Sequence, residues 1–184
     1  NNNYKYTPEV FDTWMNILRR VPGSVLWLLA DNPWAEANLK NEARIREIDV
    51  SRVIFAPRVE PEHYLARYAV ADLFLDTFPF NGGSTANDAL WMGLPVLTRS
   101  GRSFASRMAG ALLTAADLPE LITYDWRDYE NKAVALAHAP DHCRRLHEHL
   151  HGVRTSGKLF DTPRFVRHLE EHFKRLVADL SGGK

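Results

Sequence analysis

The chain of 184 residues has little cysteine, no excess of charge of either sign and no long hydrophobic run. Its single cysteine, Cys143, cannot form an internal disulfide, which is typical of a reducing compartment such as the cytoplasm. The 23 basic and 23 acidic residues cancel, so no broad field indicates nucleic acid or an anionic membrane as a partner. No apolar run approaches the ~20 residues that span a bilayer. We therefore expect a soluble cytoplasmic protein.

Common catalytic motifs are missing as well. No lysine follows Gly82-Gly83 as it would in a P-loop, which argues against phosphoryl transfer of that kind. Ser103 and Ser106 lie outside any GxSxG pattern, so they do not indicate a serine hydrolase. With 45% hydrophobic residues and no visible repeat, the chain is expected to bury one core. It has no initiator Met and opens on three asparagines, so we expect a piece of a longer protein.

Histidines are frequent near the C-terminal third, at positions 142, 147, 149 and 151. His147 and His151 have the i, i+4 spacing that places two imidazoles on one helix face, as a metal site requires. No carboxylate or cysteine completes a ligand set. The favoured interpretation is a solvated histidine-rich helix and no bound metal, with a metal site as the alternative.

The stretch Leu75–Gly93 (LDTFPFNGGSTANDALWMG) has the order of a strand, a glycine turn and a helix start. The apolar run breaks at the pair Gly82-Gly83, and Ser84 then opens an apolar-periodic segment. Glycines carry no Cβ, so a ligand can approach the backbone closely. The free N–H groups of a first helical turn favour negative charge. We therefore expect an anion at this turn.

Three polar side chains follow the turn. Ser84 and Thr85 can donate to phosphate oxygens, and Asp88 stands one helical turn later. A carboxylate near phosphate is repelled unless it has another task, such as accepting hydrogen bonds from ribose hydroxyls. The pattern therefore favours a nucleoside diphosphate. The alternative stays open that Ser84 only caps the helix and Asp88 only complements its dipole.

Apolar and amphipathic segments alternate along the first two thirds of the chain. Short apolar runs predict strands at 24–30, 52–57, 72–76, 95–98 and 121–123, with helices between them, the last at 104–115. This βαβ alternation predicts an α/β fold with a Rossmann-like, doubly wound, mostly parallel sheet over 1–124. Helices are expected over 125–184, and the final one carries an apolar stripe that could pack on a sheet or on a missing neighbour.

Ligands of open parallel sheets bind beyond the carboxyl ends of the strands. Three loops therefore compete to line the site, at 31–34, 57–63 and 76–85. Lys5, just ahead of the first helix, is either a solvated surface lysine or a counter-charge for phosphate. Position alone favours the surface interpretation, because most lysines are exposed.

The run LDTFPFNGGSTANDALWMGLPVLTRSGRSFASRMAGALL resembles the carboxyl-terminal lobe of the O-linked N-acetylglucosamine (O-GlcNAc) transferase family, whose members have the two-lobed GT-B fold. Further similar segments are NNNYKYTPEVFDTWMNILRRVPGSVLWLL, RVIFAP and LFDTPRFVRHLEEHF, in the right order along nearly the whole chain. The resemblance implies one nucleotide-sugar-binding lobe over 1–184. The amino-terminal lobe and the repeat region of such enzymes are absent from this sequence.

The resemblance implies roles for three residues that precede the glycine turn in the sequence. Lys5 matches the lysine that contacts the donor's diphosphate, where a positive charge offsets the leaving group. Asn2 stands where relatives carry a glutamine that helps to hold the same phosphates. His63 matches the histidine whose ring lies by the uracil.

Ser84 and Thr85 match the paired hydroxyls at the diphosphate, and Asp88 matches the acid that takes the ribose hydroxyls. Two departures are visible. Gly83 stands where animal relatives have a histidine, so one packing contact to the nucleotide is absent or differently supplied. A lysine near the base has no clear counterpart in the shorter loop at 58–62, and Arg58 is the candidate for its role. These changes resemble a bacterial relative more than an animal enzyme.

The resemblance implies the UDP-N-acetylglucosamine-binding half of an inverting, metal-independent glycosyltransferase that modifies Ser or Thr hydroxyls of intracellular proteins. It needs no cofactor, and Lys5 is its catalytic residue, stabilising departing UDP together with the helix start. Alone, this lobe is expected to bind UDP weakly and to turn over nothing. Two alternatives remain: a related transferase using GDP-fucose or UDP-glucose, and a noncatalytic nucleotide-binding or scaffolding lobe, which the loss at Gly83 would fit.

Overall fold

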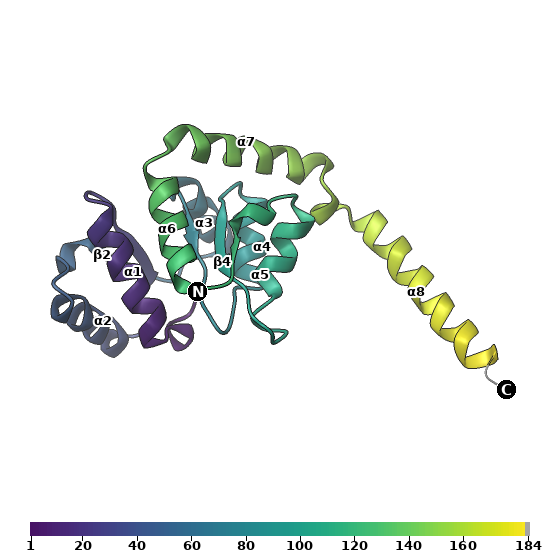
Figure 1. Cartoon of the computed structure of the whole chain (residues 1–184), viewed down its shortest axis with the longest axis horizontal. Coiled ribbons are helices and arrows are strands. Elements are labelled where there is room, and N and C mark those ends of the chain that lie inside the picture. Colours follow the sequence, from purple (N-terminus) through teal and green to yellow (C-terminus); the bar gives the residue numbers. More distant parts are fainter. Residues whose placement is uncertain (183–184) are drawn as a thin grey trace.

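The computed structural model describes residues 1–182 of the chain. Strands and helices alternate through a body that ends near residue 160, and one long helix then stands away from it (Figure 1). Every strand pairing is parallel. The predicted α/β class with parallel strands is therefore confirmed.

The first part of the body is a βαβ unit with a helix ahead of it. Its elements are α1 (Pro8–Arg20), β1 (Leu26–Leu29), α2 (Pro33–Ile45) and β2 (Val53–Ala56). The Thr7 hydroxyl accepts a hydrogen bond from the amide of Val10, and a proline occupies the first helical position, so α1 starts where the sequence predicts. β1 and β2 pair in register, Leu26 opposite Val53.

The second part of the body carries three strands in the order β3-β4-β5. Its elements are α3 (Pro61–Ala66), β3 (Phe74–Leu75), α4 (Ser84–Trp91), β4 (Val96–Arg99), α5 (Met108–Ala115) and β5 (Ile122–Thr123). The helix predicted at 104–115 starts only at Met108. Residues 103–107 form a turn instead, in which the amides of Ser106 and Gly101 bond to Ser103 and Ser106 carbonyls.

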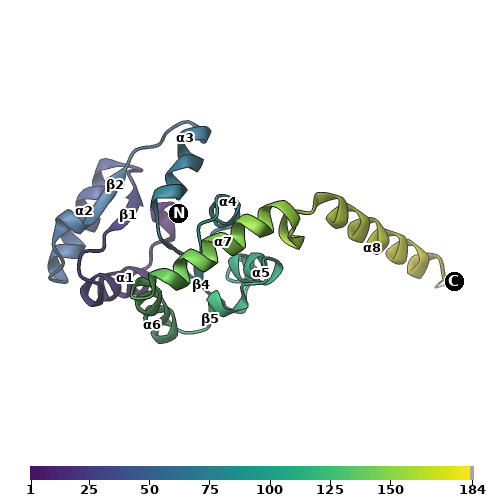
Figure 2. The same cartoon turned by 90° about the horizontal axis from the view of Figure 1, so that it is seen from above.

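The mostly parallel sheet expected from the sequence is present as two hydrogen-bonded sheets, β1-β2 and β3-β4-β5. β3 is only two residues long and pairs with β4. Side chains join the two sheets instead: Leu97 of β4 lies in the same buried cluster as Leu26 and Leu28 of β1, and Leu73 packs against it. Figure 2 shows the two sheets side by side, with α3 near α4. The site described below lies where the two parts meet.

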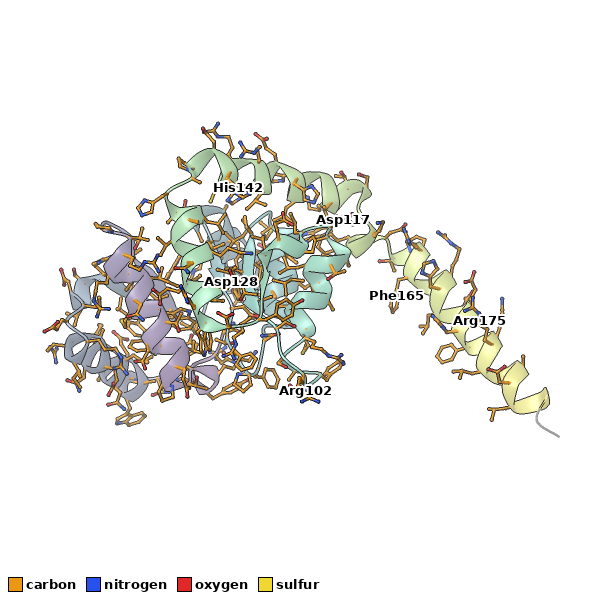
Figure 3. The ribbon with its side chains drawn as sticks, in the orientation of Figure 1. Arg102, Asp117, Asp128, His142, Phe165 and Arg175 are labelled. Carbon is orange, nitrogen blue, oxygen red and sulfur yellow. The ribbon has the colours of Figure 1, made fainter. Side chains whose placement is uncertain are left out.

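The C-terminal helices are α6 (Trp126–Ala137), α7 (Pro140–Ser156) and α8 (Thr162–Gly182). α6 packs against α1 and β4, and α7 packs against α4 and α6. α8 stands away from the body, and Figure 3 shows the side chains of Phe165 and Arg175 projecting from it. Its apolar stripe is exposed, with Phe173 and Leu176 each 58% accessible. The stripe therefore does not pack on either sheet. Of the two interpretations that the sequence allowed, packing on a sheet is thus excluded for the described residues.

Candidate functional site

α4 starts directly after the glycine turn, with Gly83 as its N-cap residue and no side-chain cap. Ser84 is therefore the first helical residue and not the cap, which corrects that interpretation of its role. Within residues 1–182, the amides of Ser84, Thr85 and Ala86 have no hydrogen-bond acceptor, and the exposed Ser84 hydroxyl has no partner. These free donors and the positive end of the helix dipole form a place for an anion.

A buried carboxylate holds the glycine turn in place. Asp76 follows β3 at once, and its oxygens accept hydrogen bonds from the Gly82 amide (2.7 Å), the Thr98 hydroxyl (2.7 Å) and the Asn1 side-chain amide (3.3 Å). Burial raises the pKa of Asp76, and the bonds from Gly82 and Thr98 oppose that rise. Sequence reasoning missed Asp76, although an acid at the carboxyl end of a buried strand was a usable signal.

Lys5 ends a short 3₁₀ turn, Asn3–Lys5, and reaches across to the glycine turn. Its Nζ donates to the Asn81 carbonyl at 3.1 Å and to Asn1 Oδ1 at 3.2 Å, and lies 4.5 Å from the ring centre of Phe80. All of these partners are neutral, and within residues 1–182 no carboxylate forms a salt bridge with Lys5. The partly buried ammonium group is therefore available to an anion at the helix start.

The Asn1 side chain ties the amino-terminal segment to α4. Its Oδ1 accepts from Lys5 and also from the Thr85 hydroxyl at 3.3 Å, while its amide nitrogen donates to Asp76. Residues more than 70 positions apart are thereby fixed at one point. Lys5 and Thr85, both predicted site residues, are brought together in this way, and Asn1 is a contributor that the sequence did not indicate.

Two of the predicted loops meet beside this point. The guanidinium of Arg58 donates to Asp31 Oδ1 at 2.6 Å and to Asn2 Oδ1 at 3.4 Å. Asn2 and Arg58, both predicted, are therefore neighbours. Asp31 partly neutralises Arg58, whose side chain is 64% exposed, so Arg58 offers less free positive charge than Lys5 does.

Two tyrosines tie α3 and the 3₁₀ turn that follows it, Arg67–Val70, to α4. The Tyr64 hydroxyl donates to Asp88 Oδ2 at 3.4 Å, and the Tyr68 hydroxyl donates to the Thr85 carbonyl at 3.2 Å. His63 lies on the same short helix, exposed and next to Tyr64. The structure thus places the helix of His63 beside Asp88, and within residues 1–182 neither the His63 ring nor the Ser84 hydroxyl forms a hydrogen bond with another predicted site residue.

The two glycines of the turn differ in what surrounds them. A Cβ on Gly82 would lie 2.8 Å from the Thr85 hydroxyl and 3.2 Å from the Ala86 amide nitrogen. A Cβ on Gly83 would lie 2.4 Å from the Cε of Met108, the far end of a flexible side chain. Gly82 is therefore required by the turn itself. At Gly83, Met108 fills the space that a side chain would take.

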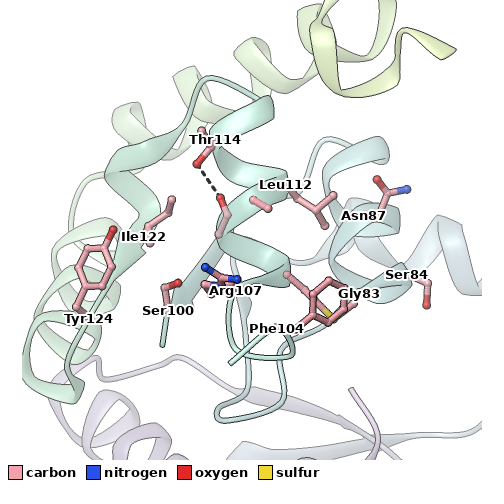
Figure 4. Close-up of a pocket in the computed structure, with 13 residues that line it drawn as sticks. Gly83, Ser84, Asn87, Ser100, Phe104, Arg107, Leu112, Thr114, Ile122 and Tyr124 are labelled. Atoms are coloured by element: carbon pink, nitrogen blue, oxygen red, sulfur yellow. Dashed lines mark hydrogen bonds between the residues drawn. The ribbon is translucent and has the colours of Figure 1, made fainter. Parts of the chain in front are cut away.

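An open, mostly apolar groove of about 740 Å³ begins at Gly83 and Ser84 and passes around α5 to Tyr124. Figure 4 shows Asn87 and Ser84 on one side of α5 and Ile122 and Tyr124 on the other. The free amides of α4 lie at one end of this groove, so it widens the space next to the anion site.

The histidines of α7 form no comparable arrangement. Residues 147–151 read HEHLH and match the letters of the zinc-peptidase pattern HExxH. However, the His149 ring bonds to the Ala116 carbonyl at 2.8 Å, and Glu148 is exposed. In the part of the chain that the structure describes, no three His, Cys, Asp or Glu side chains are placed to hold a metal, and no helix is long and apolar enough to cross a membrane.

Comparisons with known proteins agree with one another. The model of glycosyl transferase family 41 matches residues 1–169. The chain is 36% identical over 177 residues to the probable UDP-N-acetylglucosamine--peptide N-acetylglucosaminyltransferase SEC of Arabidopsis thaliana, a match that covers 96% of this chain and 18% of that protein. It is 35% identical over 171 residues to the UDP-N-acetylglucosamine--peptide N-acetylglucosaminyltransferase of Caenorhabditis elegans, covering 93% of this chain and 15% of that one.

A solved structure is also similar. A mutant O-GlcNAc transferase of Thermobaculum terrenum matches with a TM-score of 0.90 and 31% sequence identity, over 95% of this chain and 34% of that one. The sequence therefore spans less than a fifth of the two relatives and about a third of the solved chain.

Proposed function

The chain belongs to glycosyltransferase family 41, and from this premise we propose that it is the donor-binding lobe of an enzyme that transfers N-acetylglucosamine from UDP to Ser or Thr hydroxyls of intracellular proteins. One observation carries the proposal. The free amides of α4, the Thr85 hydroxyl and the unneutralised Lys5 ammonium converge on one point from segments more than 70 positions apart in the sequence.

The diphosphate of the donor fits this point. The amides of Ser84 and Thr85 can donate to phosphate oxygens, and Lys5 adds a full positive charge at the edge of the turn. In an inverting transfer, the acceptor hydroxyl releases its proton and its oxygen bonds to the anomeric carbon, while the bond from that carbon to the phosphate oxygen breaks and UDP leaves. The negative charge that develops on UDP is then stabilised by Lys5 and the helix start, the task that a divalent metal has in other transferases.

The nucleoside end of the donor would extend from the same point toward α3. Asp88 accepts hydrogen bonds from the ribose hydroxyls, and His63 places its ring by the uracil. Asn2 and Arg58 lie beside the amino-terminal segment, where they support the phosphates and the base. The support for these roles is the hydrogen bond that holds α3 beside Asp88.

The rest of the enzyme is the partner that this lobe requires. The matched relatives are at least five times longer than the region matched here, and α8 presents an apolar stripe that includes Phe165 (64% exposed) and Phe173 (58% exposed). We place the amino-terminal lobe against this stripe and across the donor from α4, where it would bring the acceptor protein. The isolated lobe is then expected to bind UDP weakly and to be inactive.

Calorimetric titration of the full-length enzyme with UDP, UDP-N-acetylglucosamine, GDP and GDP-fucose tests the proposal, with the Lys5→Ala variant as the matched control. We expect UDP and its sugar to bind more tightly than the guanine nucleotides without added metal, and Lys5→Ala to weaken UDP. A preference for GDP would instead support a fucosyltransferase of the same superfamily. Absence of binding by every nucleotide would support a noncatalytic scaffolding lobe.

A further inference from the structure

Two tyrosines on the α3 side of the site are not used by the function proposed above. Tyr64 and Tyr68 lie one turn apart, with their ring centres separated by 5.3 Å in an edge-to-face arrangement. Their hydroxyls are hydrogen-bonded to each other. Tyr64 also reaches Asp88, and Tyr68 reaches the Thr85 carbonyl. Both contacts end on α4, next to the predicted nucleotide.

The protons of this pair can be counted. Each tyrosine hydroxyl has one proton to donate, and a carbonyl or an ionised carboxylate can only accept. The two hydroxyls thus have two protons for three contacts, and either tyrosine can donate in the bond between them. When Tyr68 donates to Tyr64, the Tyr64 proton is free for Asp88 Oδ2, the charged acceptor 3.4 Å away. Tyr68 thus holds Tyr64, and Tyr64 holds one side of Asp88.

The other side of Asp88 is left open. Within residues 1–182, its Oδ1 accepts no hydrogen bond, although the residue is only partly exposed. A carboxylate fixed through one oxygen presents the second in a defined direction, which is the arrangement needed to accept from neighbouring hydroxyls of a ribose. Burial raises the pKa of both Tyr64 and Tyr68, so both hydroxyls keep their protons across the physiological pH range.

We propose that Tyr64 is a positioning residue for ribose recognition: supported by Tyr68, it orients the Asp88 carboxylate toward the ribose hydroxyls of the bound nucleotide. This inference rests on the proposed function, because it requires a nucleoside diphosphate at α4. It adds that donor affinity depends on a hydroxyl that does not touch the donor. It also assigns a function to the hydrogen bond between Tyr64 of α3 and Asp88 of α4.

The test uses the full-length enzyme with the Tyr64→Phe substitution, which removes the hydroxyl and keeps the ring. Calorimetry would measure the Kd of UDP and of 2′,3′-dideoxy-UDP, which lacks the hydroxyls that Asp88 accepts from. We expect Tyr64→Phe to weaken UDP about 3- to 10-fold, the scale of one hydrogen bond, and to leave dideoxy-UDP unchanged. Ser156→Ala is the control, because Ser156 is exposed at the end of α7 and, among the described residues, its hydroxyl bonds only to the Gly152 carbonyl.

Equal weakening of both nucleotides by Tyr64→Phe would show a merely structural role and overturn the inference. So would unchanged binding of UDP, or a wild-type enzyme that binds UDP and dideoxy-UDP equally well. In each of these cases the wild type still binds UDP, so the proposed donor-binding function stands; equal binding of UDP and dideoxy-UDP would also remove the ribose role of Asp88. A wild type that binds no UDP would remove the proposed function and this inference together.

Discussion

The start of α4 and the histidine helix α7 both carry sequence patterns of a functional site, yet only the first has the contacts of one. At the start of α4, Asn1 and Lys5 bond to residues about 75 or more positions away. On α7, the HEHLH run at 147–151 matches a metal motif in letters, but its one described long-range bond is from His149 to the Ala116 carbonyl. At the start of α4, residues from distant segments of the chain converge. On α7, the histidines are neighbours along a single helix.

This difference shows that a sequence pattern on one helix does not by itself make a binding site. A ligand needs groups that approach it from several directions, and one exposed helix face supplies only one direction. Ser84 alone could have been an ordinary cap residue, and the position of Lys5 across the turn gives it a different meaning.

Lys5→Ala in the full-length enzyme is expected to reduce turnover at least ~100-fold, the scale of losing one donor that stabilises transition-state charge. Lys5 has only neutral partners in the lobe, so its charge is not consumed by the fold. Steady-state kinetics with saturating donor would measure the effect. Lys40→Ala is the matched control, since Lys40 pairs with Glu36 on the surface of α2 and should leave turnover unchanged. An active Lys5→Ala enzyme would remove Lys5 from the mechanism.

Asp76→Asn is expected to lower the free energy of unfolding by about 1–3 kcal/mol, because the Gly82 amide and the Thr98 hydroxyl donate to different oxygens of Asp76 and asparagine keeps only one of them. Urea unfolding would measure it. The exposed Asp141, bonded only to Arg144, provides the control, and Asp141→Asn should change stability by no more than about 0.5 kcal/mol. Equal effects of the two substitutions would mean that the buried carboxylate does not support the turn.

The difference in unfolding free energy between the wild type and Asp76→Asn should depend on pH. Burial raises the pKa of folded Asp76 above its ordinary value of 3.8, so the folded state keeps a proton there that the unfolded state has lost. The stability contributed by Asp76 is therefore full below pH 3.8 and falls as pH rises through the raised pKa. Asn does not titrate, so the stability difference between the wild type and Asp76→Asn should narrow with rising pH and then become constant. A difference that widens over this range would contradict the assigned direction.

The smallest effect is expected on α7. Replacing both His147 and His151 by alanine should leave turnover, UDP affinity and metal content unchanged, because the described residues supply no third ligand. Zinc analysis of the purified wild type and the double variant, together with kinetics, would measure this. Stoichiometric zinc in the wild type that is lost in the variant would show that α7 is a site after all.

Much of this architecture could be predicted from the sequence. The family resemblance is confirmed, and the strands and helices lie near their predicted positions because their apolar periods and caps are local signals. The division into two sheets could not be predicted, since it depends on side chains such as Leu97 and Leu73 packing across the chain. The division into a core at 1–124 and helices at 125–184 stays a prediction.

The site was predictable only in part. Ser84, Thr85 and Asp88 carry a local pattern, whereas Lys5, Asn2, Arg58 and His63 were identified by resemblance. Asp76, Asn1 and Tyr64 were missed because their importance comes from partners far away in the sequence. The ligand roles of the eight predicted residues remain predictions, and so does the absence of a metal requirement.

A crystal structure of the full-length enzyme with UDP would show where the donor's diphosphate lies. We predict that the diphosphate oxygens lie about 2.7–3.2 Å from the amides of Ser84 and Thr85 and from Lys5 Nζ, with the ribose hydroxyls at Asp88. Clear density for UDP away from α4, with the Ser84 amide still unpaired, would show that the start of α4 is not the diphosphate site.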